Sequence, residues 1–204
     1  MVKTLASQAK NGGSIPLARS SPLAFPSPPL ADAVVALRPW READVDRGLM
    51  LFADPLVQRF SWTEARPYTV DDARAYFEGI EAGRRAGRQL EFAVTEPGDE
   101  EAVLGCVSLF DVDAVNAGAA TGYWLAAHGR GRGAATHAVR LLTGWALVTL
   151  GLQRIQLTCA PDNAASQAVA ERCGFTREGV LRSHLAFKGG RRDTVVYGLV
   201  AGDR

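Results

Sequence analysis

The chain has 204 residues, of which 47% are hydrophobic and 22% charged. This length and composition suit one globular domain with a full hydrophobic core. The 23 basic and 22 acidic residues leave a formal charge of +1, so no bulk charge favours binding to nucleic acid or to a membrane surface. Three cysteines without CxxC spacing argue against a disulfide framework and a zinc site. No apolar run approaches the roughly 18 residues of a membrane span, and we expect a cytoplasmic protein.

Residues 1–33 are predicted to form a disordered tail. Residues 1–31 contain five prolines and several serines but no Asp or Glu, and such a composition buries too little apolar surface to order itself. The segment also resembles an organellar transit peptide, although it lacks the Arg-rich amphipathic helix of such peptides. The folded domain is expected over residues 34–201.

The first half of this domain alternates helical and extended patterns. Residues 34–40 are predicted to form a strand, and residues 42–52 a helix that stops before Asp54 and Pro55. An irregular aromatic loop is expected next, and Thr69 is the expected N-cap of a helix with two aspartates in its first turn. The further predicted elements are the loop 58–68, the helix 70–85 and the strands 90–96, 102–110 and 119–126, with a Pro-Gly-Asp turn at 97–99.

The second half begins with the strongest helical pattern in the chain. After Gly133 the apolar residues recur with a period of 3.6, which predicts a helix that ends near Gly151. Residues 154–159 alternate as a half-buried strand does. A helix over 164–173 ends at Gly174, and two strands flank Gly189 and Gly190. This order of elements predicts a mixed α/β sheet with helices packed against it.

A glycine-rich loop connects the strand at 119–126 to the strongest helix. Residues 123–136 read YWLAAHGRGRGAAT, so the loop lies beside first-turn amides that have no partner within the helix. Such a site suits a phosphate or pyrophosphate, and Arg130 and Arg132 add positive charge there. A solvent-exposed loop with a basic rim is the simpler alternative.

Residues 129–134 also satisfy the G-x-G-x-x-A fingerprint of dinucleotide-binding enzymes. That fingerprint expects an acidic residue about 20 positions further on, where this chain has Arg154. The strands before the loop also look antiparallel, which fits a βαβ unit poorly. A dinucleotide-dependent oxidoreductase is therefore the weaker alternative.

Several motifs together resemble the GNAT superfamily of acetyl-CoA-dependent N-acetyltransferases. Residues 130–135, RGRGAA, match its pyrophosphate motif R/Q-x-x-G-x-G/A. The segments GYWL, AVRLLTGWAL and CAPDNAASQAVAERCGFTREGVLR look like the ribosomal-protein-alanine N-acetyltransferase branch. The resemblance extends over residues 34–200 and implies a mixed, mostly antiparallel sheet that is splayed at the acetyl-CoA site and flanked by helices.

The resemblance also implies roles for individual residues. Backbone groups at 123–126 would pair with the pantetheine arm, and amides of the glycine loop would hold the pyrophosphate. Asn163 would contact the pantetheine or simply cap its helix. Ser166 would protonate the departing thiolate or bond its own backbone. The implied cofactor contacts are Trp124, Leu125, Arg130, Gly131, Arg132, Gly133, Ala134, Ala135, Thr136, Asn163 and Ser166.

The catalytic base is harder to place, because this chain has Leu185 and Ala120 where relatives can carry carboxylates. The remaining candidates are His184, Glu91 and Asp111. The ordinary alternatives are an exposed or packed histidine for His184 and solvated strand-end charges for Glu91 and Asp111. Direct attack by a neutral amine needs a base or an ordered water but no metal.

The acceptor would be a protein N-terminus or a small-molecule amine. The aromatic segment with Phe60 and Trp62 is the candidate acceptor wall, unless it forms a small core of its own. A homodimer is expected by analogy only. The missing carboxylates keep a second alternative open, a non-catalytic acetyl-CoA-binding protein.

Overall fold

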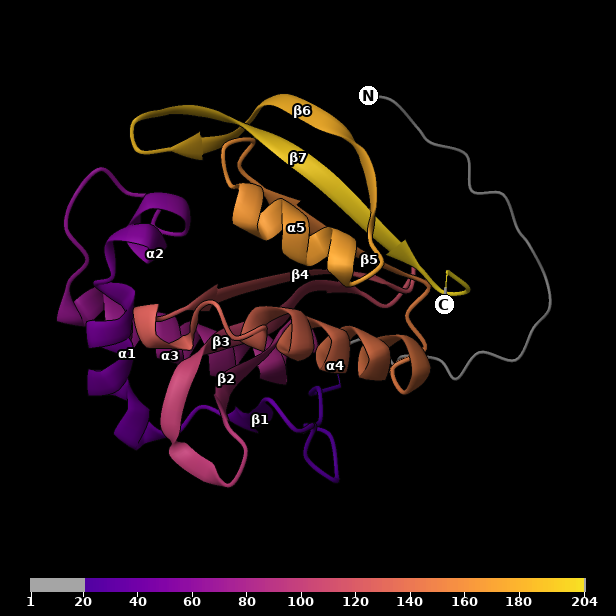
Figure 1. Ribbon diagram of the computed structural model, residues 1–204, viewed down its shortest axis with the longest axis horizontal. Coiled ribbons are helices and arrows are strands. Elements are labelled where there is room, and N and C mark those ends of the chain that lie inside the picture. The colour runs from indigo at the N-terminus through magenta and orange to yellow at the C-terminus, as the bar shows by residue number, and fades with distance from the viewer. Residues whose placement is uncertain (1–20, 204) are drawn as a thin grey trace.

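In the computed structural model, which describes residues 21–203, one seven-stranded sheet runs through the molecule (Figure 1). Its order is β1-β2-β3-β4-β5-β7-β6, and every neighbouring pair is antiparallel except β4 with β5. The expected mixed, mostly antiparallel sheet is confirmed. The strands are β1 Ala36–Pro39, β2 Leu90–Glu96, β3 Asp99–Asp113, β4 Gly118–Leu125, β5 Arg154–Cys159, β6 Thr176–Phe187 and β7 Gly190–Val200.

Helices cover both faces of this sheet and define two hydrophobic cores. The larger core joins the sheet to α4 and α5 and includes the fully buried Leu142 and Tyr197. The smaller core lies on the side of α1 and α2 and contains Phe52 and Trp124. The α-helices are α1 Val45–Phe52, α2 Pro55–Phe60, α3 Val70–Arg85, α4 Ala134–Val148 and α5 Ala164–Arg172, and short 3-10 helices occupy Glu42–Asp44 and Ala127–Gly129.

The only parallel pair among the described strands separates part-way along its length. The ladder between β4 and β5 joins Gly118–Thr121 to Arg154–Leu157 and then ends. Beyond Thr121, β4 continues to Leu125 with pairing to β3 alone. Within the described residues, the last four positions of β4 therefore have no strand beside them on the β5 side, as the predicted splay requires.

Local sequence signals account for several boundaries. Thr69 caps α3 in a reciprocal capping box with Asp72, which confirms the predicted N-cap. Gly105 is required by close packing, since a Cβ there would lie 2.2 Å from the carbonyl oxygen of Trp124. No helix of the described residues is long and apolar enough to cross a membrane, and no cluster of metal-ligating side chains occurs among them.

Three expectations are corrected. The loop predicted at 58–68 begins inside α2, because the Asp54 carboxylate accepts hydrogen bonds from the Leu56 and Val57 amides and Pro55 suits the first helical position. The helix predicted at 42–52 is split into a 3-10 turn and α1. The strand predicted at 102–110 is longer and runs over Asp99–Asp113 as β3.

The prediction of a disordered tail is wrong for residues 21–33. Leu23 is 4% exposed and belongs to the larger core, where its carbonyl oxygen accepts a hydrogen bond from Arg84. Asp32 lies 2.7 Å from His137 on α4. Each of these contacts depends on a single residue, so the average composition of the segment gives no sign of them. Residues 1–20 lie outside the described residues.

Candidate active site

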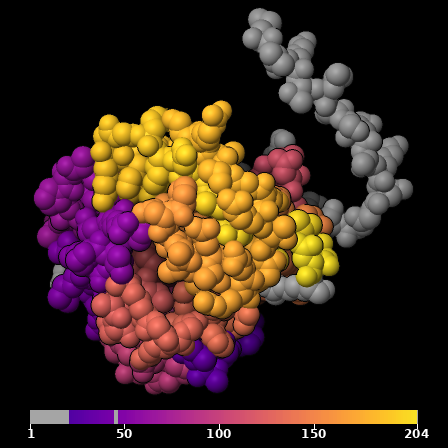
Figure 2. Space-filling view, turned by 45° about the horizontal axis from the view of Figure 1, so that its top comes forward, coloured from indigo at the N-terminus to yellow at the C-terminus, as the bar shows by residue number. Residues whose placement is uncertain are grey.

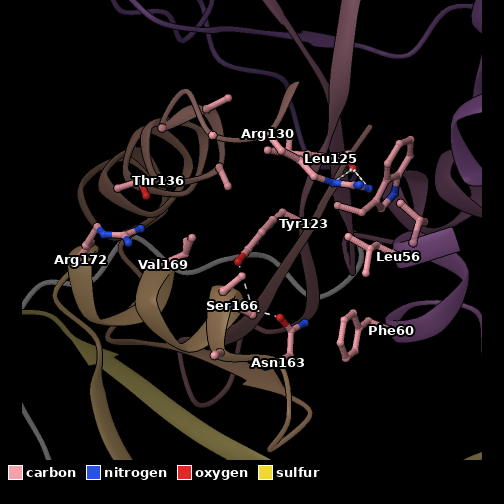
Figure 3. A pocket seen from close by; sticks show the side chains of 18 of the residues that line it. Leu56, Phe60, Tyr123, Leu125, Arg130, Thr136, Asn163, Ser166, Val169 and Arg172 are labelled. Carbon is pink, nitrogen blue, oxygen red and sulfur yellow. Dashed lines mark hydrogen bonds between the residues drawn. The ribbon is translucent and has the colours of Figure 1, made fainter. Parts of the chain in front are cut away.

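A cavity of about 870 Å³ opens where β4 and β5 separate (Figure 3). Its walls come from α2, the end of β4, the start of α4 and the start of α5. Most of the residues implied in cofactor binding lie on it together. They are Trp124, Leu125, Arg130, Gly131, Gly133, Ala134, Ala135, Thr136, Asn163 and Ser166.

The glycine loop presents backbone donors to this cavity. Gly133 is the N-cap of α4 with φ of 81°, and Gly131 has φ of 76°. Both values lie in the left-handed region that favours glycine. The first amides of α4 have no partner inside the helix, and the helix dipole adds positive potential at this end. The loop and helix start therefore form a surface suited to an anionic group.

The two arginines of the loop are committed to other contacts. Arg130 donates through Nε and Nη2 to the carbonyl oxygen of Leu125, and Nη2 lies 2.5 Å from an oxygen of Asp54. This guanidinium lowers the pKa of the Asp54 carboxyl. Arg132 pairs with Glu96 at 2.5 Å on the surface and does not line the cavity. Arg130 therefore holds the loop to α2, and the sequence-based role of Arg132 finds no support in its position.

Asn163 and Ser166 meet on α5 as the motif implied. Asn163 is the N-cap of that helix, and its side-chain oxygen accepts a hydrogen bond from the Ser166 amide at 3.1 Å. The hydroxyl of Tyr123 donates to Ser166 Oγ at 3.1 Å. Burial raises the pKa of Tyr123 to about 12, so this donor keeps its proton. The Ser166 hydroxyl lines the cavity and also lies within hydrogen-bonding reach of the Cys159 thiol.

The aromatic segment divides between the cavity and the smaller core. Phe60 lines the cavity beside Leu56, whereas Trp62 does not. The Trp62 ring packs against Tyr68 at 5.0 Å, and its indole nitrogen donates to the carbonyl oxygen of Arg66. The proposed acceptor wall thus reduces to Phe60 and its α2 neighbours.

None of the three base candidates lines the cavity, but their surroundings differ sharply. Asp111 is exposed, and His184 lies half-buried on β6. Glu91 is 3% exposed, and its carboxylate accepts a hydrogen bond of 2.5 Å from the Tyr76 hydroxyl. Burial raises the pKa of Glu91 to about 7. The expectation of a solvated strand-end charge is therefore wrong for Glu91.

Glu91 lies on the face of the sheet that carries the smaller core. Its register partner is Ser108, which in turn pairs with Gly122 two residues before Trp124. Tyr76 and Trp124 both contact the Phe52 ring, at centroid distances of 6.1 and 5.6 Å. A buried carboxyl group with a pKa near neutrality thus lies behind the wall that Trp124 contributes to the cavity.

Sequence reasoning missed several residues that line the cavity. Tyr123 escaped notice because only the backbone of its motif was considered, although alternation along β4 places its side chain toward α5. Arg140 and Arg172 bring positive charge to the rim, with Arg140 bonded to the Arg172 carbonyl oxygen. His137 also lines the cavity, and its Nδ1 lies 2.7 Å from a carboxylate oxygen of Asp32.

Comparison with known proteins decides the family. The acetyltransferase (GNAT) domain model matches residues 35–176. The chain belongs to the GNAT acetyltransferase family. This result confirms the resemblance found in the motifs and overturns the dinucleotide-dependent oxidoreductase alternative.

Individual relatives agree. The ribosomal-protein-serine acetyltransferase of Escherichia coli (strain K12) is 32% identical over 127 residues, which cover 62% of this chain and 69% of that protein. YdaF of Bacillus subtilis (strain 168), named as an N-acetyltransferase, is 40% identical over 98 residues. That match covers 48% of this GNAT chain and spans only 54% of YdaF.

A solved structure links the fold to a ligand. The microcin C7 self-immunity acetyltransferase MccE, in complex with acetyl-CoA and AMP, superposes with a TM-score of 0.72 at 25% identity. The superposition covers 83% of this chain and 93% of that one. GNAT relatives with this fold therefore bind acetyl-CoA.

Proposed function

We propose that this GNAT protein transfers the acetyl group of acetyl-CoA to a primary amine, by direct attack while both substrates are bound. The observation that carries the proposal is the separation of β4 from β5 beside the free amides of α4. The open edge at 122–125 offers backbone groups to the pantetheine amides, and the α4 amides would hold the pyrophosphate. The residues present fit the cosubstrate, since the glycine loop leaves open space beside Gly131.

The reaction needs one bond formed and one broken. The lone pair of the neutral amine attacks the thioester carbonyl carbon, the new C–N bond forms, and the C–S bond breaks to release the CoA thiolate. Ser166 is the proposed donor to that thiolate, because its hydroxyl lines the cavity and accepts from Tyr123. A backbone amide at the end of β4 would stabilise the oxyanion.

The amine must lose a proton before or during attack. We assign this proton to Glu91, reached through the Tyr76 hydroxyl, because a base works best when its pKa lies near the working pH. In this relay Tyr76 passes its own proton to the Glu91 carboxylate and receives the amine proton past the Trp124 wall, because neither Tyr76 nor Glu91 lines the cavity. The neutral acid later returns the proton to solvent. Glu91 is preferred to the candidate His184, which also lies outside the cavity, because Glu91 lies behind the Trp124 wall whereas His184 lies on β6.

A pair of glycine substitutions tests the cosubstrate site. In Gly133→Val, the side chain meets a φ of 81° and the His137 ring 3.5 Å away, so we expect CoA binding to be lost while the domain stays folded. Gly98→Val is the matched control, because Gly98 has φ of 79° and nothing nearby in a turn remote from the cavity. Calorimetric titration with CoA measures binding, and thermal melting reports folding. Wild-type affinity in Gly133→Val would refute the proposed site.

Release of free thiol separates an enzyme from a binding protein. Purified protein mixed with acetyl-CoA and a panel of amines should liberate CoA, which a thiol reagent detects. The missing carboxylates at Ala120 and Leu185 motivate the alternative. Tight CoA binding without thiol release for any amine would favour the non-catalytic acetyl-CoA-binding protein.

A further inference from the structure

The hairpin of β6 and β7 carries buried polar atoms that lack partners. Within the described residues, five buried side-chain nitrogen or oxygen atoms have no hydrogen-bond partner, and three of them lie on this hairpin. They are His184 Nδ1, Arg192 Nε and Thr194 Oγ1. An unpaired buried donor costs free energy, so each of these atoms calls for a partner that the described residues do not supply.

Arg192 does not line the cavity itself but lies behind Phe60, which does. Its Nη1 donates to the carbonyl oxygen of Phe60 at 3.2 Å, and its guanidinium lies 3.8 Å from the Phe187 ring centre. Phe60 and Asp162 both line the cavity, and Asp162 is close enough to act on the charge of Arg192. Figure 2 shows the purple α1–α2 region beside the yellow hairpin at one end of the molecule.

Among the described residues, no carboxylate lies within 4.0 Å of the Arg192 guanidinium. Asp162 instead forms its ion pair with Arg59 at 2.7 Å. Partial burial lowers the pKa of Arg192, since the charge is poorly hydrated and poorly paired. An arginine in this state gains from an anion that displaces the remaining water.

The strand register places Arg192 and Thr194, but not His184, on one face of the hairpin. Arg192 pairs with Leu185, the neighbour of His184, and Thr194 pairs with Leu181. Side chains at 192 and 194 point to the same face of β7 because they are two residues apart. The irregularity between Leu181 and Leu185 inserts extra residues of β6 opposite this stretch, with Ser183 at φ of 51°.

We propose that Arg192 binds a carboxylate of the acceptor, so that the substrate class is an amine carrying a carboxylate within a few bonds. The guanidinium fork matches a carboxylate through two parallel N–H groups. This inference rests on the proposed function and adds its substrate class. A free amino acid and a peptide with an acidic residue next to its N-terminus both supply this chemistry.

Matched amines test the inference. Leucine is compared with leucinamide, an Ala-Asp peptide amide with its Ala-Asn counterpart, and phosphoethanolamine with ethanolamine. We expect kcat/KM to be higher for the carboxylate member in one of the first two pairs, and the pair that responds tells the free amino acid from the peptide. Equal rates within both of those pairs, or a preference for the phosphate alone, would overturn the inference. No thiol release with any amine would instead overturn the proposed function.

Variants of two neighbouring arginines identify the residue responsible. Arg192→Gln should lower kcat/KM for the carboxylate substrate by roughly 10- to 100-fold, the effect of one charged hydrogen bond, and leave its uncharged partner little changed. Arg191→Gln is the matched control, because Arg191 is exposed and bonds to the Ser183 and His184 carbonyl oxygens. Arg192→Lys keeps the charge without the fork and should retain part of the preference. CoA titration and melting check each fold, and an equal loss for both members of a pair would contradict a recognition role.

Discussion

Replacement of Glu91 by Gln offers a sharp test of the buried acid behind the cavity. Glutamine keeps the size of the side chain and an oxygen that accepts from the Tyr76 hydroxyl. It removes the only ionisable group of that side chain. Tyr76, Cys106 and Tyr68 are the titratable groups that interact with Glu91, and burial raises the pKa of all three. They are therefore neutral where Glu91 titrates.

Proton linkage gives the size and the sign of the effect of Glu91 on the free energy of unfolding at each pH. The pKa of Glu91 rises from an ordinary 4.5 to about 7 on folding. Between these values the folded protein holds a proton that the unfolded chain has lost, so stability falls as the pH rises through this window and is level above it. At about 1.4 kcal/mol per pH unit, the gap amounts to about 3 kcal/mol. The Glu91→Gln variant has no carboxyl group at this position, so its stability does not show this fall with pH.

Urea unfolding at pH 4 and at pH 8 measures the effect. The free energy of unfolding of wild type minus that of Glu91→Gln should decrease by about 3 kcal/mol from the lower to the higher pH. Glu78→Gln, an exposed change on α3, serves as the control. A difference that does not vary with pH would refute the raised pKa. If Glu91 also accepts the amine proton, kcat should fall by about 10² or more in Glu91→Gln while CoA affinity stays.

Two further substitutions address the thiolate donor and the fold. Ser166→Ala should lower kcat, by about 10² as for loss of a general acid, with little change in the KM for acetyl-CoA, and an unchanged kcat would remove Ser166 from the mechanism. Asp44→Asn breaks a buried pair in which Arg38 binds both carboxylate oxygens at 2.6 and 2.9 Å, so unfolding in urea should show a loss of about 3 to 5 kcal/mol. Asp71→Asn, which alters an exposed side chain, should show none, and equal losses would contradict the reasoning.

Periodicity and capping predicted most elements of the sheet and its helices. Thr69 with Asp72 fixed the start of α3, and the 3.6-residue pattern after Gly133 located α4. The glycine loop was also readable, because positive φ and free amides follow from glycines at a helix start. These are local properties, set by residues a few positions apart.

The side-chain partners were not predictable, because they join distant segments. Arg130 looked like a phosphate ligand, yet it pairs with Asp54, which is 76 residues away. Glu91 was expected to be solvated, because the sequence of β2 does not indicate that Tyr76 of α3 covers this side chain. The sequence did not indicate a binding role for Arg192, because that role depends on the contact between the hairpin and α2. Tertiary packing determines whether such groups are charged and whether they are already bound to a partner.

The alternation of one strand separates the two proton transfers of the proposed reaction. Tyr123 points toward α5, where it bonds to Ser166, the donor to the thiolate. The next residue, Trp124, points to the opposite face, where the smaller core encloses Glu91. Because β4 is unpaired on its β5 side at this level, a thioester bound there would have Ser166 on one face and the Trp124 wall, with Glu91 behind it, on the other. In the proposed reaction the thiolate would therefore be protonated on one face of the sheet and the amine deprotonated toward the other.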